Sequence, residues 1–278
     1  MKRVVLGNNT QRERLFFKGL HFGLVLTVPP RRPLRDSLAP IDIRLHIGPV
    51  AVSLLDPKRV GFPDPEQARK DGLLALGGDL SVPRLLEGYR QGIFPWTDNP
   101  VTWWSPQPRA IFELASFQPP RRLRQKLRQG RFQLTLDRDF AAVIAGCAEP
   151  APGREETWIS PQFVRAYTEL HRLGHAHSVE VWEGARLVGG IYGVALGGFF
   201  AGESMFHRAT DASKVALCHL IDHLRQAGFV LFDTQVATSL TRSLGAVEIS
   251  RREYLARLHR AVNLPVSFSP LPRQEAAA

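Results

Sequence analysis

The sequence predicts a mixed α/β fold, and three consecutive patterns in the second half of the chain support this prediction. Residues 187 to 202 alternate apolar with small or polar positions around Gly197 and Gly198, which is typical of a β-hairpin with a tight turn. Residues 212 to 228 place apolar side chains at helical spacing, and residues 229 to 232 form a short apolar run. The order strand, strand, helix, strand indicates helices packed against a sheet.

The helix and the strand that follow the hairpin have recognisable ends. Asp211 stands where an N-cap is expected, and Gly228 stands where a helix commonly stops. The apolar run at 229 to 232 is typical of a strand buried on both faces, and it delivers Asp233 and Gln235 at its carboxyl end. Because the two residues are two positions apart on a strand, we expect their side chains to share a face.

Glu203 adds a third polar group near the end of the hairpin. A single acid at a strand end commonly caps or hydrogen-bonds a loop, so none of these residues identifies a site alone. Taken together, Asp233, Gln235 and Glu203 predict a polar site at the rim of the sheet. The order of elements is also the core unit of acyltransferase-like α/β folds, although a fold by itself decides no function.

Seven segments before the hairpin predict further regular elements. Ser81 and Pro83 mark the start of the first helix, and Gly174 marks the end of the last one. In order, the expected elements are a helix over 82–91, a strand over 110–114, a helix over 119–131, a strand over 132–136, helices over 140–148 and 160–173, and a strand over 177–182.

Changes in composition divide the chain into four parts. Residues 1–50 show no persistent periodicity, and residues 263–278 are rich in Pro, Ser and Ala. The expected parts are a disordered extension over 1–50, a small amino-terminal domain over 51–115, an α/β domain over 116–262 and a loose tail over 263–278. The apolar stretch at 15–28 contains Lys18 and His21 and lacks a cleavage site, which argues against a signal peptide or a membrane span.

The net charge of +10 is unevenly distributed along the chain. Residues 1 to 60 hold 11 Lys and Arg against 4 Asp and Glu, and the remainder holds 25 against 22. Within that nearly neutral remainder, the expected helix at 119–131 carries six cations and no acid. This run indicates either a phosphate-facing surface or a solvated cationic helix face. The cations are Arg121, Arg122, Arg124, Lys126, Arg128 and Arg131.

Other residue types narrow the function further. Trp96, Trp103 and Trp104 lie close together, which is typical either of a small domain's core or of an aromatic wall for an apolar side chain or an unstacked base. Cys147 and Cys218 have no metal-ligand or disulfide spacing, which fits a reducing cytoplasm. The histidines at 171, 175 and 177 do not complete a ligand set at a familiar spacing, so we expect no metal site there.

Ten short strings between residues 62 and 258 resemble the bacterial leucyl/phenylalanyl-tRNA protein transferase family. In order, they are GLLALGGDLS, GIFPW, WWSPQPR, ETWI, LHRLGHAHSVEVW, LVGGIYGV, GESMF, ASK, DTQ and SLGA. The resemblance implies an enzyme that transfers Leu or Phe, sometimes Met, from aminoacyl-tRNA to the amino-terminal Arg or Lys of a protein and so marks it for degradation. It also implies a small amino-terminal domain on an acetyltransferase-like (GNAT-type) carboxyl domain. We further expect a cytoplasmic monomer that needs no cofactor.

The resemblance also implies roles for individual residues. Asp233 and Gln235 match the family's catalytic pair, and Glu203 matches an acid that would anchor the basic acceptor side chain. Six residues match positions for the 3′ end of the aminoacyl-tRNA and its side-chain pocket: Tyr89, Trp96, Trp158, Tyr167, Ile191 and Phe200. The family often has Cys, Ser, Asn and His where this chain has Thr234, His207, Asp211 and Leu240. The last of these departures removes any hydrogen bond that a His would make there.

The sequence leaves two rival functions and two mechanisms open. An acyl-CoA acetyltransferase needs a Gly-rich turn for pyrophosphate. The four Arg-x-x-Gly starts in this chain are each followed by a bulky residue at the sixth position. A non-catalytic RNA-binding protein would leave Asp233, Gln235 and Glu203 unexplained. For the transferase itself, either the polar residues or a ribose hydroxyl of the substrate could relay the proton of the attacking amine.

We also expect translation to start at a valine codon. Family members usually begin about a dozen residues before the pair that is Phe62 and Pro63 here, which places the start near Val50 or Val52. No Met lies between Met1 and Met205. The intact mass of the protein from its native source checks this expectation. A mass that includes residue 1, together with weaker tRNA binding after truncation to Val50, would show instead that residues 1–49 are a functional basic arm.

Overall fold

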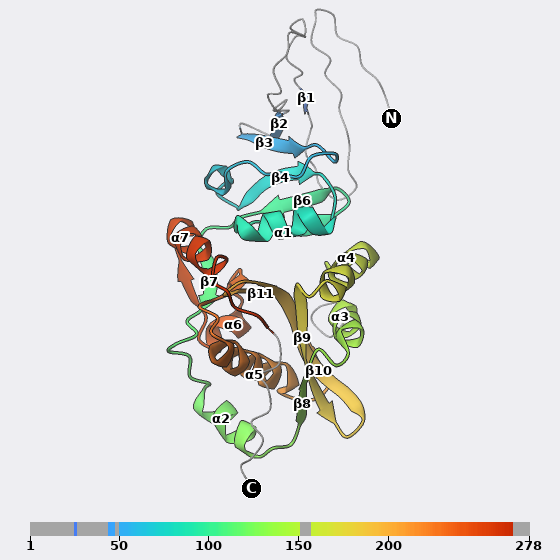
Figure 1. The fold of residues 1–278 in the computed structure, drawn as a ribbon, viewed down its shortest axis with the longest axis vertical. Helices are drawn as coiled ribbons and strands as arrows, with labels where there is room; N and C mark the ends of the chain where they lie inside the picture. Colours follow the sequence, from blue (N-terminus) through green and yellow to red (C-terminus); the bar gives the residue numbers. More distant parts are fainter. Residues whose placement is uncertain (1–24, 27–43, 48–49, 151–156, 269–278) are drawn as a thin grey trace, which may run out of the picture.

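A computed structural model describes residues 25–26, 44–47, 50–150 and 157–268 of the chain. Two β-sheets, placed end to end along the long axis of the molecule, carry the helices on their faces (Figure 1). The mixed α/β class predicted from the hairpin, helix and buried strand is therefore confirmed. Among the described residues, no helix is both long and apolar enough to cross a bilayer.

The first sheet has six strands and belongs to the amino-terminal part of the chain. Its order is β1 (Val25–Leu26), β2 (Arg44–Ile47), β3 (Val50–Leu55), β4 (Leu73–Gly77), β6 (Val101–Trp104) and β5 (Phe94–Asp98). All neighbouring strands are antiparallel except β3 and β4. A short 3₁₀ helix at Pro65–Gln67 and helix α1 (Val82–Arg90) complete this part, and α1 faces the second sheet (Figure 1).

The second sheet has seven strands. Its order is β13 (Val247–Ile249), β7 (Arg109–Phe112), β12 (Leu231–Gln235), β11 (Phe199–His207), β10 (Arg186–Leu196), β9 (Ala176–Glu183) and β8 (Gln133–Leu136). The pair β11 and β12 is parallel and the other pairs are antiparallel. The helices of this part are α2 (Arg121–Arg128), α3 (Phe140–Ala148), α4 (Pro161–Arg172), α5 (Ala212–Ala227), α6 (Ser239–Ser243) and α7 (Arg251–Ala261).

Apolar side chains on the two faces of the second sheet form two separate cores. Neighbours on β10 show the division, because Ile191 packs with the side chains of α5 whereas Tyr192 packs with those of α3 and α4. Figure 1 shows α5 on one side of the strands and α3 and α4 on the other. The core that contains Tyr192 continues into the first sheet through Tyr89 and Trp103. This shared core fixes the two sheets relative to one another.

Strand β7 belongs to a different part of the molecule than the predicted domain division placed it in. The expected small domain ended at residue 115, but β7 pairs with β12 and β13 in the second sheet, so the first sheet ends at Trp104. A local pattern could not show this, because β7 reads as a strand in either sheet. Strands β1 and β2, and Val50 at the start of β3, fall within the expected extension over 1–50. The rest of that extension lies outside the described residues, so its disorder and the valine start stay predictions.

Two expected helix caps and one strand also differ from prediction. Ser81 and Asp211 occupy the N-cap positions of α1 and α5, but neither side chain bonds to its helix. Asp211 has a left-handed backbone, and its carboxylate instead accepts hydrogen bonds from Lys214 Nζ at 2.7 Å and from Lys126. The apolar run at 229–232 is buried only in part, because Val230 lies before β12 and is 56% exposed.

The segment after α7 is held against the core at Phe268, where we expected a loose tail. Phe268 is 2% exposed, and its ring stacks on His177 at a centroid distance of 4.2 Å and on Phe200 at 5.6 Å. Its carbonyl oxygen also lies 3.2 Å from Nε2 of His223. A single aromatic side chain thus attaches the segment to the core around α5. Residues 269–278 lie outside the described part of the chain.

The packing of Phe268 gives a test of this attachment. Phe268→Ala should lower the free energy of unfolding by about 3 kcal/mol, because it removes a buried ring and leaves a cavity. Val230→Ala is the control, since its exposed side chain should cost less than about 0.5 kcal/mol. Urea unfolding followed by circular dichroism measures both variants. Equal small losses for the two would show that the segment contributes nothing to stability.

Candidate functional site

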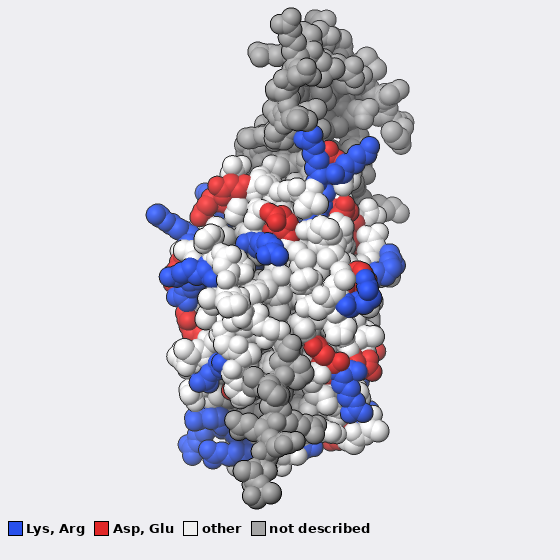
Figure 2. Space-filling model, in the orientation of Figure 1, with Lys and Arg blue, Asp and Glu red and all other residues white. Residues whose placement is uncertain are grey.

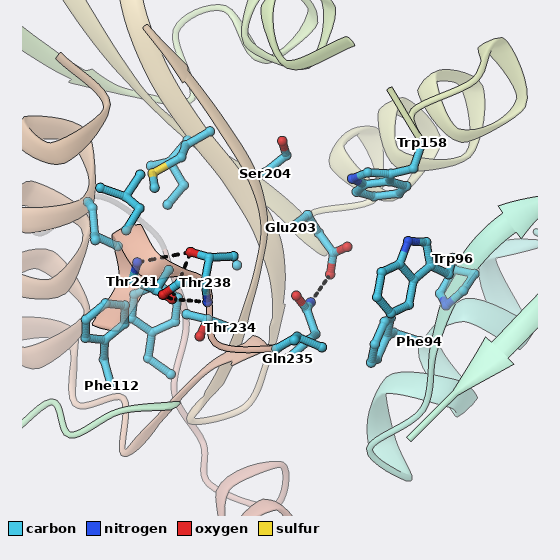
Figure 3. Close-up of a pocket in the computed structure, with 18 residues that line it drawn as sticks. Phe94, Trp96, Phe112, Trp158, Glu203, Ser204, Thr234, Gln235, Thr238 and Thr241 are labelled. Atoms are coloured by element: carbon cyan, nitrogen blue, oxygen red, sulfur yellow. Dashed lines mark hydrogen bonds between the residues drawn. The ribbon is translucent and has the colours of Figure 1, made fainter. Parts of the chain in front are cut away.

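A cavity of about 440 Å³ lies between the two sheets. One wall comes from β5 and from the segment before α4, with Phe94, Trp96 and Trp158 (Figure 3). The opposite wall comes from β11, from β12 and the residues after it, and from α6. This wall includes Glu203, Gln235 and a group of apolar side chains. The cavity therefore has an aromatic wall, a polar edge and an apolar end.

The cavity opens where two parallel strands stop pairing. The paired residues of β11 and β12 end at Ala201 and Asp233. The residues after these positions line the cavity instead of continuing this ladder. They are Gly202 to Met205 on β11, Thr234 and Gln235 at the end of β12, and Val236 after it. The carboxyl ends of adjacent parallel strands are a common location for binding sites in such sheets. The expected position of the site, at the rim of the sheet, agrees with this geometry.

Glu203 lies at the polar edge within hydrogen-bond distance of three side chains. Oε1 accepts from Tyr89 Oη at 2.8 Å and from Gln235 Nε2 at 3.0 Å, and Oε2 lies 3.1 Å from Tyr167 Oη. The two tyrosine oxygens are themselves 2.6 Å apart. Tyr89 belongs to α1 and Tyr167 to α4. The carboxylate is therefore held by residues from both halves of the molecule.

The surroundings of Glu203 change its acidity. Burial raises the pKa of the Glu203 carboxyl to about 7, against the opposing effect of the hydrogen bonds from Tyr89 and Tyr167. The nearby Asp233 also raises this pKa, and Arg109 lowers it. A carboxyl group with this pKa exchanges its proton near neutral pH. Such groups are common at sites that move protons or bind cations.

Gln235 has an unusual backbone that aims its side chain at Glu203. Its φ angle is 56°, in the left-handed region, and the pairing of β12 with β7 is irregular between Asp233 and Gln235. The Gln235 N–H donates to Oδ1 of Asp233 at 2.8 Å. This local irregularity breaks the strand alternation. The expectation that Asp233 and Gln235 share a face therefore does not hold, and only Gln235 lines the cavity.

Asp233 is fully buried and does not line the cavity. Oδ1 accepts from Arg109 Nε at 2.9 Å and from the Gln235 N–H, and Oδ2 accepts from Arg109 Nη2 at 2.6 Å and from Tyr254 Oη at 2.8 Å. A carboxylate offers about four lone-pair positions, and these four bonds occupy them. The geometry thus gives Asp233 the role of a support for Gln235. It leaves no lone pair for an incoming proton.

Arg109 holds this buried cluster together, and the sequence analysis did not single it out. Its guanidinium is 1% exposed, bonds Asp233 at two points, and donates to the carbonyl oxygen of Gly92 at 3.0 Å. It also lies 4.3 Å from the ring centre of Tyr254 and 5.0 Å from that of Phe94. Although burial disfavours the charge, the Asp233 carboxylate raises the pKa of Arg109 above its ordinary value. The sequence feature that could have indicated Arg109 is its position at the end of the string WWSPQPR, which resembles the family.

The structure separates the predicted aromatic residues into two groups. Trp96 and Trp158 face the cavity, and Trp96 is 39% exposed at its mouth (Figure 3). Trp103 is fully buried and donates from Nε1 to the carbonyl oxygen of Gly77 at 2.9 Å, so it is a core residue. Phe200 is also buried, packed among other rings behind β11, and is not part of the cavity wall.

The apolar end of the cavity contains one predicted residue and several that the sequence analysis missed. Ile191 was expected. The additional lining residues are Phe112, Met205, Leu217, Phe232 and Leu240. They come from β7, β11, α5, β12 and α6, so no local pattern could bring them together. Leu240 occupies the position where the family often has His, and it makes this end more apolar.

The basic helix α2 lies at the far end of the molecule from the first sheet. Figure 2 shows its Lys and Arg side chains gathered at that end. Lys126 pairs with Asp211, and Arg131 Nη2 lies 2.8 Å from Glu183 Oε1. The other four cations of the run are exposed, and none of them has an ion pair within the described residues. They are Arg121, Arg122, Arg124 and Arg128.

Comparisons with known proteins identify similar sequences over most of the chain. The profile of the leucyl/phenylalanyl-tRNA protein transferase family matches residues 111–259, and the profile of its N-terminal domain matches residues 78–107. Two proteins named leucyl/phenylalanyl-tRNA–protein transferase are also similar to this chain. The one from Syntrophobacter fumaroxidans is 56% identical over 73% of this chain and 88% of its own length. The one from Anaeromyxobacter sp. (strain K) is 51% identical over 75% and 91%.

Solved structures show a much weaker similarity. A GCN5-related N-acetyltransferase-like protein from Streptococcus suis aligns with a TM-score of 0.33 and 16% sequence identity, over 84% of this chain and 87% of that one.

The buried pair of Arg109 and Asp233 gives a test of the cluster behind the site. Arg109→Met should lower the free energy of unfolding by about 3–5 kcal/mol, because it leaves a buried carboxylate without its partner. The double variant Arg109→Met with Asp233→Leu should recover much of that loss, since no unpaired charge remains. Urea unfolding measures both. Additive losses in the double variant would show that the two residues stabilise the fold independently.

Proposed function

Because this chain belongs to the leucyl/phenylalanyl-tRNA protein transferase family, we propose that it transfers Leu or Phe from aminoacyl-tRNA to the amino-terminal Arg or Lys of acceptor proteins and so marks them for degradation. The observation that best supports this activity is the cavity itself. It combines an apolar end, an aromatic mouth and one carboxylate, which suit an apolar aminoacyl group, a base and a cationic amine respectively.

The reaction makes modest demands on the protein. The ester of aminoacyl-tRNA is already activated, so the attacking α-amine must be neutral, oriented and relieved of a proton. No metal ion or covalent protein nucleophile is required for this step. Orientation within the cavity can therefore supply most of the rate enhancement.

The two ends of the aminoacyl-tRNA 3′ terminus fit different parts of the cavity. The Leu or Phe side chain occupies the apolar end, where Ile191, Leu217 and Leu240 exclude water. The terminal adenosine lies at the mouth, because unstacked bases pack on aromatic side chains and both Trp96 and Trp158 are available there. The ester carbonyl then falls near Gln235, between the apolar end and the polar edge.

The polar edge receives the acceptor. Glu203 supplies the negative charge that a cationic amino-terminal residue requires, and charge-assisted hydrogen bonds to carboxylates are among the stronger ones in proteins. Gln235, whose amide donates to Glu203, is placed to orient the attacking amine. Asp233 contributes from behind by fixing the Gln235 backbone, so the pair acts as one positioning unit.

An acetyl-CoA-dependent reaction fits this geometry less well. Acetyltransferases hold pyrophosphate at the amino terminus of a helix. Helix α5 follows the hairpin and is the element expected to do so, but residues 207–211 before it read HRATD and contain no glycine for such a turn. A non-catalytic RNA-binding function would leave the Glu203 network without a purpose.

A single assay separates the three functions. The purified chain is incubated with radiolabelled Leu-tRNA or Phe-tRNA and a protein with amino-terminal Arg, and in parallel with acetyl-CoA and the same acceptor. We expect label transfer only from the aminoacyl-tRNA. Transfer from acetyl-CoA would support the acetyltransferase, and tRNA binding without any transfer would support the RNA-binding protein.

We further propose that α2 contacts tRNA phosphates and that the protein acts as a cytoplasmic monomer. The exposed cations of α2 are support for the phosphate surface, because Lys and Arg near phosphates release counterions on binding. The cytoplasmic location is based on the spacing of Cys147 and Cys218, and it stays a prediction together with the monomeric state.

The phosphate surface can be tested by charge reversal. Changing Arg121, Arg124 and Arg128 together to Glu should weaken tRNA binding and reduce the slope of log K against log salt by roughly 2–3, since each lost phosphate contact reduces it by about 0.7–0.9. A control with the same change in net charge places Glu at Arg165, Arg172 and Arg252, which are exposed on α4 and α7. Filter binding over a salt series measures the slopes. Equal effects of the two triple variants would contradict a local contact at α2.

A further inference from the structure

In the proposed transfer, the attacking amine must lose a proton to a group that it can reach in the cavity. Among the side chains that line the cavity in the described structure, Glu203 is the sole ionisable one. Asp233, the acid closest to Gln235 in the sequence, is sealed behind it with all its lone pairs occupied. Glu203 is therefore the carboxylate that a bound acceptor can reach.

The number of available protons limits how many of the contacts around Glu203 can be hydrogen bonds at the same time. Three oxygen-to-oxygen contacts link Glu203, Tyr89 and Tyr167 in a ring, at 2.6 Å between the tyrosines, 2.8 Å to Oε1 and 3.1 Å to Oε2. The two tyrosines bring two hydroxyl protons. If Glu203 is ionised, one of the three contacts has no proton. If Glu203 is protonated, every contact in the ring has one.

The distances show which contact lacks its proton in the ionised state. A contact of 2.6 Å between two oxygens requires a proton, which either tyrosine could supply. Of the two contacts to the carboxylate, the one from Tyr89 is shorter, at 2.8 Å against 3.1 Å, so Tyr89 keeps its proton for Oε1 and Tyr167 donates to Tyr89. Tyr89 in turn donates to Oε1, which also receives the Gln235 amide. The remaining contact, from Tyr167 to Oε2, is the longest. Oε2 is therefore the oxygen that is open to a new proton.

We propose that Glu203 Oε2 accepts a proton from the α-ammonium of the acceptor and is the general base of the transfer reaction. One N–H bond of the ammonium breaks and an O–H bond to Oε2 forms, and the new hydroxyl donates to Tyr167. The neutral amine then forms the C–N bond to the ester carbonyl carbon as the bond from that carbon to the ribose oxygen breaks. The amine's second proton goes to the ribose oxygen, and the third stays on the new amide.

The groups around Glu203 suit this role. Tyr89 on α1, Tyr167 on α4 and Tyr192 on β10 face it, and burial raises the pKa of each tyrosine well above its ordinary value, so they stay neutral. Behind it, Asp233 and Arg109 have opposite effects on its pKa. The resulting value of about 7 for Glu203 lies close to that of an α-amine, roughly 7.7–8.0. A proton can pass between such groups without a large penalty.

The decisive variant is Glu203→Gln, which keeps the size of the side chain but cannot take a proton. Single-turnover transfer of Leu from Leu-tRNA to a peptide with amino-terminal Arg is measured at saturating peptide. At pH 7 we expect the rate to fall by roughly 6- to 11-fold, because an α-amine with a pKa of roughly 7.7–8.0 is neutral only to that extent without a base. Binding of Leu-tRNA should be unchanged. A variant that keeps the wild-type rate at saturating peptide, and only raises the KM for the peptide, would overturn the proposal and leave Glu203 as an anchor.

The pH dependence gives a second readout. In the wild type, kcat/KM for the peptide should rise with a midpoint near pH 7 as Glu203 ionises. In Glu203→Gln the midpoint should move to roughly 7.7–8.0, where the α-amine itself loses its proton. An unchanged midpoint between the two proteins would contradict the assignment.

A pair of tyrosine variants keeps the proposal testable if Glu203→Gln fails to fold. Tyr89→Phe removes a donor to Glu203, so the wild-type midpoint should move to higher pH. Tyr192→Phe is the matched control, because the Tyr192 hydroxyl is buried nearby without a hydrogen-bond partner in the described structure. Equal midpoints in the two variants would overturn the proposal. A wild type that transfers no Leu at all would instead refute the proposed function.

Discussion

The buried ion pair of Arg109 and Asp233 is the interaction on which the rest of the site depends. Two charges removed from water are stable only when their geometry is close and their remaining hydrogen-bonding groups are satisfied. Here Arg109 donates two hydrogen bonds to the Asp233 carboxylate and one to the carbonyl oxygen of Gly92. The Tyr254 hydroxyl donates a further hydrogen bond to the same carboxylate. The pair thereby connects β7, β12, α7 and the turn after α1. It fixes the place where the first sheet meets the second.

This cluster explains the unusual backbone of Gln235. A left-handed residue other than glycine carries a conformational cost of about 1–2 kcal/mol, which must be offset by its surroundings. The bond from the Gln235 N–H to Asp233 does so and turns the side chain toward Glu203. A regular strand would have placed Gln235 with Asp233 on one face. The buried charges therefore act on the cavity indirectly, through the direction of one amide.

Glu203 shows how one carboxyl can be tuned by groups from both sheets. Desolvation raises its pKa, and the hydroxyls of Tyr89 and Tyr167 limit that rise. Neither tyrosine is near Glu203 in the sequence, and each comes from a different helix. The position of α1 relative to α4 thus sets the acidity of the site. Contact between the two sheets is a condition for the chemistry as well as for the fold.

The sequence by itself determined the class of fold, the order of most elements and the family of the protein. Periodicity and helix stops are local, so the hairpin, α5 and β12 could be predicted within a few residues. The polar residues at the rim were also visible, as Glu203 and Gln235. The tertiary structure alone decided that Asp233 is sealed behind Arg109, that β7 joins the second sheet and that Tyr89 meets Tyr167. Those outcomes depend on contacts between residues far apart in the chain, which no local pattern encodes.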